Sequence, residues 1–244
     1  MRITRIHVGE TLRSGAELVL PVAASAHLIK VLRLRVGAPL TVFNGQGGEY
    51  EAELLDGSSA ARIRIGAHSA IERESPLSLT LLQAISRGER MDLIVQKAVE
   101  LGVTRIVPVA AERSVVRLDA AQAEKRRAHW QSIVISACEQ CGRNRIPELA
   151  PVVDTATAVA AADAAATRLL LAPEADRTLI DAVRGIIAAV LLIGPEGGLS
   201  EREELLASRH GFSGCRLGPR ILRTETAPLA ALAVVQAVAG DFAT

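Results

Sequence analysis

The stretch LLIGPEGGLS at residues 191–200 decides how this chain folds, together with LGPRILRTET at residues 217–226. Each stretch begins as a short apolar run, breaks at a Gly-Pro pair and continues into a segment typical of a helix. A buried strand followed by a glycine turn and a helix is part of a βα unit. In open α/β sheets, ligands bind at the carboxyl ends of the strands. We therefore expect the two loops to form two walls of one ligand site.

The composition permits a sizeable core but leaves the partner open. The chain has 244 residues, of which 49% are hydrophobic and only 2% are aromatic, so Leu, Val, Ile and Ala must fill the core. The formal net charge is +1. Gross charge therefore neither supports nor excludes RNA as a partner, and a polyanion would have to bind to a local basic patch.

The N-terminal sequence and the cysteines bear on location and on metals. The first ten residues, MRITRIHVGE, lack the apolar segment of a signal peptide, and no uncharged apolar run of about 18 residues occurs. These features predict a soluble, cytoplasmic protein without a membrane segment. Cys138 and Cys141 form a lone C-x-x-C inside a predicted helix, without the second ligand pair that zinc requires. We predict no metal site and interpret both cysteines as packing residues.

Apolar periodicity divides the chain into two parts. Up to about residue 70, short alternating segments predict a small β-rich unit, interpreted as a barrel, around one helix at residues 27–34. From residue 78 onwards, continuous apolar runs alternate with helical patterns, as in a parallel α/β sheet. The runs expected to be strands of this sheet lie at residues 79–85, 106–110, 168–172, 189–193 and 215–217. A charged segment at residues 70–76 that ends in proline is the predicted linker.

The loop at residues 194–198 lacks the pattern of either common phosphate loop, G-x-x-x-x-G-K-[ST] or G-x-G-x-x-G. Its carboxylate, Glu196, would repel a phosphate but suits an ammonium, sulfonium or hydroxyl group. Ser200 and Glu203 form a capping-box pattern that predicts the start of the next helix. A ligand-free turn explains the glycines equally well, and hydrogen bonding to the loop's own amides would explain Glu196.

The second loop carries a dense polar cluster between two apolar runs, residues 223–226. Thr226 can cap the following helix, and Pro228 is tolerated in its first turn. A capping cluster explains the threonines but leaves Arg223 and Glu225 unexplained, which favours a functional role for this loop.

Taken together, the two loops resemble the signature of the bacterial 16S rRNA uridine N3-methyltransferase family of SPOUT methyltransferases. Three further regions are similar to the same family and occur in the same order. They are His27 with residues 31–33, the segment 86–91 leading to 96–102, and the segment 137–147. The resemblance runs nearly end to end and is loose only over residues 152–188.

This resemblance implies an S-adenosyl-L-methionine-dependent homodimeric enzyme that methylates N3 of a uridine in the decoding region of 16S rRNA in the small ribosomal subunit. It implies a PUA-like, RNA-binding β-barrel at residues 1–72 and an α/β methyltransferase domain at residues 73–244. The second domain would contain a parallel sheet and a C-terminal trefoil knot. Two alternatives stay open: another rRNA or tRNA acceptor on the same scaffold, and a non-catalytic RNA-binding or assembly protein that has kept the fold.

The resemblance also implies a set of site residues. Arg223 is expected to offset charge that develops on the uracil carbonyls, and Glu225 to orient Arg223 or to accept a proton. The residues expected to bind the cofactor are Leu171, Gly194, Pro195, Glu196, Gly197, Gly198, Leu217, Gly218, Leu222, Arg223, Thr224 and Thr226. The residues expected to contact RNA are Arg5, Lys30, Arg33, Arg87, Arg143 and Arg145. A solvated charged face, or a favourable helix dipole for Arg143 and Arg145, is the alternative explanation for these cations.

Overall fold

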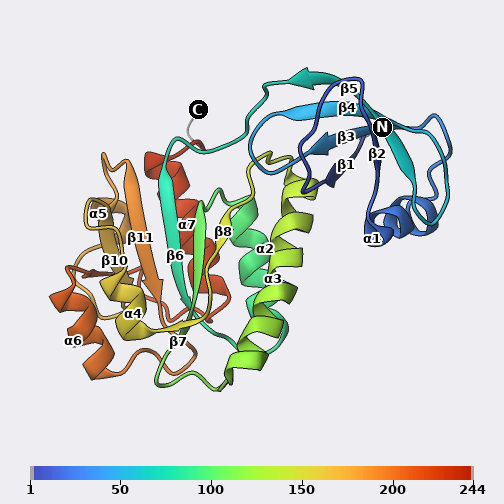
Figure 1. Ribbon diagram of the computed structural model, residues 1–244. Helices are drawn as coiled ribbons and strands as arrows, with labels where there is room; N and C mark the ends of the chain where they lie inside the picture. Colours follow the sequence, from blue (N-terminus) through green and yellow to red (C-terminus); the bar gives the residue numbers. More distant parts are fainter. Residues whose placement is uncertain (1–2, 243–244) are drawn as a thin grey trace. The chain divides into compact units, whose positions relative to one another are not determined.

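The computed structural model describes residues 3–242 and divides into two compact units (Figure 1). Within the described residues, unit 1 runs to Glu74 and also includes the later segment Cys138–Ile146. Unit 2 comprises Ser75–Ala137 and the residues from Pro147 onwards. The predicted division into residues 1–72 and 73–244 does not include this assignment of Cys138–Ile146 to unit 1.

Unit 1 is built on a five-stranded sheet with the order β1-β3-β4-β5-β2. Its strands are β1 (Thr4–His7), β2 (Glu17–Val19), β3 (Pro39–Phe43), β4 (Glu49–Leu54) and β5 (Arg62–Ser69). The pairing of β1 with β3 is parallel, and the other pairs are antiparallel. In β5, Ile63 and Ile65 are buried while Arg62 and Arg64 are exposed, which is the period-two alternation that predicted this strand.

The helix of unit 1 begins earlier than the sequence predicts. An α-helix, α1 (Val22–Ala26), is followed directly by a π-helical turn, η1 (His27–Val31). The hydroxyl of Ser25 donates to the carbonyls of Leu20 at 3.2 Å and Pro21 at 3.1 Å, just before α1, and accepts a hydrogen bond from the amide of Ala61 at 3.0 Å. The prediction started at residue 27 because the small alanines of α1 give no apolar periodicity.

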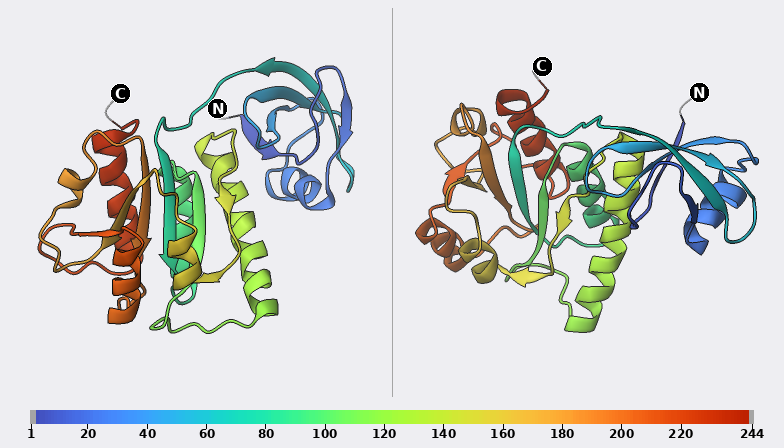
Figure 2. Two further views of the ribbon diagram at one scale, coloured as in Figure 1. Left: turned by 60° about the vertical axis from the view of Figure 1, so that its left-hand side comes forward. Right: turned by 45° about the horizontal axis from the view of Figure 1, so that its top comes forward.

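Unit 2 is built on a seven-stranded parallel sheet with the order β12-β10-β11-β6-β7-β8, in which β9 also pairs with β7 (Figures 1 and 2). Its strands are β6 (Ser78–Ala84), β7 (Arg105–Ala110), β8 (Glu148–Leu149), β9 (Val153–Asp154), β10 (Thr167–Leu171), β11 (Ala188–Ile193) and β12 (Ser213–Cys215). The central strands β6 and β11 are buried nearly throughout, as their continuous apolar runs predict.

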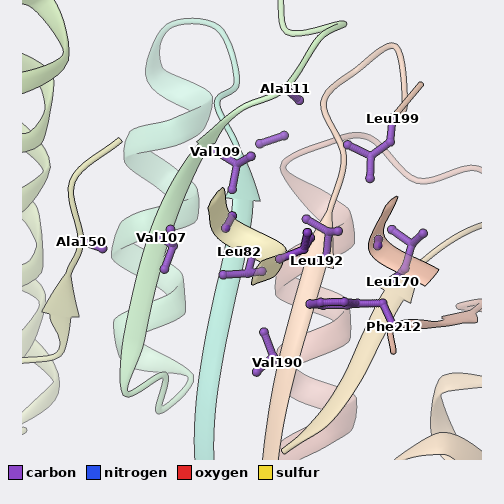
Figure 3. Packing of buried hydrophobic residues seen from close by; sticks show 14 of the residues in the cluster. Leu82, Val107, Val109, Ala111, Ala150, Leu170, Val190, Leu192, Leu199 and Phe212 are labelled. Carbon is purple, nitrogen blue, oxygen red and sulfur yellow. The ribbon is translucent and has the colours of Figure 1, made fainter. Parts of the chain in front are cut away.

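Six helices complete the described part of the chain, residues 3–242, and all but the end of α3 belong to unit 2. They are α2 (Glu89–Glu100), α3 (Ala120–Cys141), α4 (Thr155–Ala160), α5 (Leu179–Ala182), α6 (Glu201–Arg209) and α7 (Thr226–Ala239). One face of the sheet carries a cluster that includes Leu82, Leu192 and Phe212, closed by residues of α4 and α6 (Figure 3). The buried face of α2 is the one that the spacing of Met91, Ile94, Val95 and Ala98 predicts.

Several local predictions are confirmed and two are wrong. The capping box of Ser200 and Glu203 is present at the start of α6. Thr226 does not cap α7: Glu225 occupies the N-cap position, and Thr226 is already helical, with its amide donating to the carbonyl of Arg223 at 2.9 Å. The alanine-dominated stretch at residues 156–167 is helical by propensity. In the structure it is helical only to Ala160, where α4 ends, and β10 begins at Thr167. The elements β8, β9 and α5 were not predicted, since each is too short to show a period.

The N-terminal sheet and the parallel α/β sheet confirm the predicted fold class. The trefoil knot stays a prediction. None of the helices within residues 3–242 combines the length and the apolar content needed to cross a membrane.

Candidate functional site

One pocket of about 590 Å³ lies at the carboxyl ends of β10, β11 and β12 in unit 2. Its walls are the strand end at residues 170–173, the glycine loop at 193–199 and the segment from 215 to the start of α7. The two loops that the sequence singles out therefore line the same pocket. A volume of this size lies within the range of about 300–1,000 Å³ that is typical of small-molecule sites.

Most residues predicted to bind a cofactor line this pocket. These are Leu171, Gly194, Pro195, Glu196, Gly198, Leu217, Gly218, Leu222, Arg223 and Thr224. Gly197 and Thr226 are not among the lining residues. That these residues bind a cofactor stays a prediction. Those that line the pocket all belong to unit 2.

Gly197 faces Arg113, a residue that the sequence did not single out. A Cβ atom on Gly197 would lie 3.4 Å from the Cβ of Arg113. The Arg113 guanidinium donates to the carbonyl of Leu199 at 3.0 Å and to that of Gly197 at 3.4 Å. The glycine therefore makes room for an arginine that holds the main chain of the loop, and no local pattern in the sequence indicates this contact.

The carboxylate of Glu203 ties the end of the glycine loop to two other segments. Glu203 is almost completely buried and accepts hydrogen bonds from the amide of Ser200 at 2.9 Å and the amide of Glu112 at 3.0 Å. It also accepts one from the hydroxyl of Thr155 at 2.5 Å. Burial raises the pKa of Glu203, but these hydrogen bonds outweigh it and hold the pKa below its ordinary value of 4.5. The ionised carboxylate is therefore the stable form near neutral pH.

Thr224 joins three segments around the pocket. Its side chain is buried, and its hydroxyl lies 3.1 Å from the hydroxyl of Ser86, which follows β6. The same hydroxyl donates weakly to the carbonyl of Gly194 at 3.5 Å. Thr224 thus fixes the approach to α7 against the glycine loop and the end of β6.

Arg90 links the carboxylates of the two loops and was missing from the predicted site. Its Nη1 lies 2.9 Å from Oε1 of Glu196, and its Nε lies 3.7 Å from Oε2 of Glu225. Glu196 thus has an ion-pair partner that neither interpretation of this residue included. Glu225 pairs with Arg90, and within residues 3–242 it forms no ion pair with Arg223. The role of Glu225, to orient Arg223 or to accept a proton, stays a prediction. The signal available in the sequence was the position of Arg90 just after the buried run at residues 79–85.

Arg223 lines the pocket and is exposed. No acidic side chain within residues 3–242 forms an ion pair with it. Its carbonyl accepts hydrogen bonds from the amides of Thr226 and Ala227 at 2.9 Å each, so the first turn of α7 fixes its backbone. The guanidinium is consequently available to a ligand in the pocket.

Two of the arginines predicted to contact RNA have partners inside unit 1. The Arg5 side chain is 8% exposed and contacts Glu49 at 2.5 Å and the side-chain oxygen of Asn144 at 2.6 Å. The Arg143 side chain is 5% exposed, and its Nε donates to both carboxylate oxygens of Glu74 at 3.1 Å. These contacts connect Cys138–Ile146 to the rest of unit 1 and give both arginines a structural role that the sequence did not predict.

The other predicted RNA contacts are exposed. Lys30 and Arg33 lie in and just after η1, and Arg87 follows β6. Arg145 is exposed and lies 3.5 Å from Glu72. Contact of these residues with RNA stays a prediction.

Cys138 and Cys141 lie at the end of α3, Cys215 lies in β12, and within residues 3–242 none of the three forms a disulfide. Cys138 is fully buried, which confirms its interpretation as a packing residue, while Cys141 is half-buried. Burial raises the pKa of the Cys138 thiol to about 12 and that of Cys215 to about 11. Within residues 3–242, no group of three or more His, Cys, Asp or Glu side chains is placed to hold a metal ion.

Known proteins resemble this chain over its whole length. A family model for an RNA methyltransferase domain matches residues 73–236, and one for an RNA methyltransferase PUA domain matches residues 20–65. Ribosomal RNA small subunit methyltransferase E of Buchnera aphidicola is 35% identical over 242 residues, which cover 99% of this chain and 98% of the relative. The protein of the same name from Bacillus subtilis is 32% identical over 223 residues, which cover 86% and 85%.

Two solved structures extend the comparison. Ribosomal RNA small subunit methyltransferase E of Neisseria gonorrhoeae, bound to S-adenosyl methionine, is 42% identical with a TM-score of 0.91, covering 99% of this chain and 100% of that chain. A Legionella pneumophila protein in complex with the same cofactor is 42% identical with a TM-score of 0.95 at the same coverage. The chain thus belongs to the family of RNA methyltransferases with an N-terminal PUA domain that includes ribosomal RNA small subunit methyltransferase E.

Proposed function

We propose that this protein uses S-adenosyl-L-methionine to methylate N3 of a uridine in the decoding region of 16S rRNA, within the small ribosomal subunit. Family membership supports this function, and so does the S-adenosyl methionine bound in the relative from Neisseria gonorrhoeae. The observation that carries the proposal is the convergence of Arg223, Glu225 and the glycine loop on one pocket at the carboxyl edge of the sheet.

The residues of the pocket fit this cofactor. Leu171, Leu217 and Leu222 provide apolar surface for the flat adenine base. Gly218 has a φ of +70°, and apart from its two chain neighbours no residue has an atom within 4 Å of where its Cβ would lie, so its backbone is open to a ligand. The carboxylates on the pocket wall suit the ammonium and hydroxyl groups of the cofactor. When bound, the cofactor supplies an electrophilic methyl group on a sulfonium centre.

The protein's own side chains address the uridine. In this methylation a bond from N3 to the methyl carbon would form while the bond from that carbon to sulfur breaks and the neutral thioether leaves. N3 would also lose its proton, so negative charge would develop on the uracil oxygens as that proton leaves. Arg223 would offset this charge through the fixed donors of its guanidinium. Glu225 would accept a hydrogen bond or the proton, because its Oε2 forms no hydrogen bond within residues 3–242.

We further propose that residues 1–72 form an RNA-binding domain, that residues 73–244 form the methyltransferase domain, and that the enzyme acts as a cytoplasmic homodimer. The match of the PUA family model to residues 20–65 supports the first part. Lys30, Arg33 and Arg145 are exposed cations of unit 1 that would contact the RNA backbone.

Calorimetric titration with S-adenosyl-L-methionine tests the binding step. Binding is expected for the wild type and, within a few fold of the same affinity, for Arg223→Ala, because other residues line most of the pocket. Methyl transfer to purified small subunits should then be nearly abolished by this substitution. A protein that binds no cofactor would instead support the non-catalytic alternative, and normal turnover of Arg223→Ala would refute the role of Arg223.

A further inference from the structure

Arg90 stands at the pocket but has no part in the function proposed above. It is the second residue of α2, and its guanidinium approaches one carboxylate from each of two walls. Glu196 belongs to the loop after β11, and Glu225 is the N-cap residue of α7. All three side chains line the pocket.

We propose that Arg90 is a positioning residue, which joins the two pocket walls by bridging Glu196 and Glu225 and compensates their negative charge. This inference rests on the proposed function, because it concerns the same pocket and the same cofactor.

The state of Glu225 supports the charge-compensating part. Its Oε2 is buried and forms no hydrogen bond within the part of the chain that the structure describes. The Arg90 Nε, 3.7 Å away, is therefore the opposite charge that compensates this oxygen. A buried carboxylate without such a partner is strongly disfavoured.

The composition of the glycine loop supports the joining part. Gly194, Gly197 and Gly198 give this loop many accessible backbone conformations, so it needs anchors to keep one shape. Arg113 holds its main chain through the carbonyls of Gly197 and Leu199. The ion pair of Arg90 with Glu196 anchors the loop through a side chain and connects it to α2. The contact of Arg90 with Glu225 extends this connection to the start of α7.

Two ligands of the proposed reaction distinguish the charge-compensating role of Arg90 from its role in holding the loop in one shape. S-adenosyl-L-methionine carries a sulfonium cation, whereas its demethylated product, S-adenosylhomocysteine, is a neutral thioether. Removal of the guanidinium would leave two uncompensated carboxylates on the pocket wall, which attract the cation more than the neutral product. If the substitution only made the loop more mobile, it would weaken the binding of both ligands by the same factor.

The experiment uses the full-length protein without RNA and measures two quantities. Hydrogen exchange of the ligand-free protein reports on residues 194–199, where the amide of Gly198 donates to the carbonyl of Pro195 at 2.9 Å. Calorimetry gives the dissociation constants of S-adenosyl-L-methionine and S-adenosylhomocysteine. The variants are Arg90→Gln, Arg90→Lys and Glu196→Gln. The matched control is Arg127→Gln, which breaks a 2.7 Å ion pair with Glu124 on α3, away from the residues that line the pocket.

For Arg90→Gln we expect faster exchange of residues 194–199 and weaker binding of the neutral product by about threefold to fivefold, in keeping with a partly exposed ion pair. Binding of S-adenosyl-L-methionine should weaken less. The dissociation constant of S-adenosylhomocysteine divided by that of S-adenosyl-L-methionine should therefore rise. Arg90→Lys keeps the charge and should keep the wild-type ratio, although a single ammonium bridges the two carboxylates less well. Glu196→Gln should speed exchange without raising the ratio, and Arg127→Gln should change neither quantity.

Unchanged exchange in Arg90→Gln would overturn the joining role, and an unchanged ratio would overturn the charge-compensating role. If the wild type binds neither ligand, the proposed function fails. The exchange measurement on the ligand-free protein still decides whether Arg90 joins the walls.

Discussion

Replacement of Glu203 by alanine should destabilise unit 2 more than its place on a surface helix suggests. The side chain is buried, and it accepts hydrogen bonds from the amides of Ser200 and Glu112 and from the hydroxyl of Thr155. Loss of half the capping box costs about 1 kcal/mol. The two other donors, left without an acceptor, cost about 1–1.5 kcal/mol each. The expected loss in the free energy of unfolding is therefore about 3–4 kcal/mol, or roughly 6–16 °C in Tm for a domain of this size.

Chemical denaturation of the full-length protein measures this loss, and Glu201→Ala is the matched control. Glu201 is an exposed carboxylate in the same first turn, so its removal should cost only about 0.3–1 kcal/mol through the helix dipole. The pH dependence gives a second check. Because the folded pKa of Glu203 is lowered, its contribution is fully present above the ordinary value of 4.5 and is lost as the pH falls through the folded pKa. The wild type and Glu203→Ala should consequently converge in stability in acid. A loss at neutral pH no larger than that of Glu201→Ala would show that the buried hydrogen bonds of Glu203 do not stabilise unit 2.

Three further predictions concern the pocket and the cysteines. Gly218→Ala should lower the free energy of unfolding by about 1 kcal/mol and also weaken cofactor binding, because its φ of +70° strains an L residue. Gly185 has the same φ and equally open surroundings but lies outside the pocket, so Gly185→Ala is the control. Denaturation should show the same loss of stability in this control, and calorimetry should show unchanged cofactor binding. Thr224→Val should weaken cofactor affinity by about tenfold at most in calorimetry, since one buried hydroxyl contact with Ser86 is lost; an affinity equal to that of the wild type would show that Thr224 does not fix the wall. Cys138 should resist iodoacetamide at pH 8 until the protein is denatured, because burial raises its pKa to about 12; mass spectrometry of the native protein would contradict this if Cys138 reacts as fast as a free thiol.

Sequence periodicity predicts the parts of this fold in which one segment shows a complete pattern. The apolar runs of β6, β7, β10 and β11 and the spaced apolar residues of α2 are such patterns, and all of them form the expected elements. The capping box at Ser200 is equally local, because its two partners lie three residues apart. Short elements such as β8 and α5 contain too few residues to show a period.

Contacts between distant segments account for what the sequence could not predict. The anchoring of Cys138–Ile146 in unit 1 depends on a buried pairing of Arg143 with Glu74, and nothing in either local sequence specifies that pairing. Arg90 and Arg113 likewise reach the glycine loop from segments about 80 to 110 residues away along the chain, and the hydrogen bonds that use them are visible only in three dimensions. The chemistry of the two loops could be read locally, but the arginines that support them could not.

The most direct test of the proposed function is the position of the methyl group on the RNA. Small ribosomal subunits that lack the modification would be incubated with the wild-type protein and S-adenosyl-L-methionine carrying a labelled methyl group. The rRNA would then be digested to nucleosides for mass analysis. The proposed function predicts labelled 3-methyluridine at one site per subunit with the wild type and almost none with Arg223→Ala. A label on another nucleoside, on a ribose or on no nucleoside at all would contradict it.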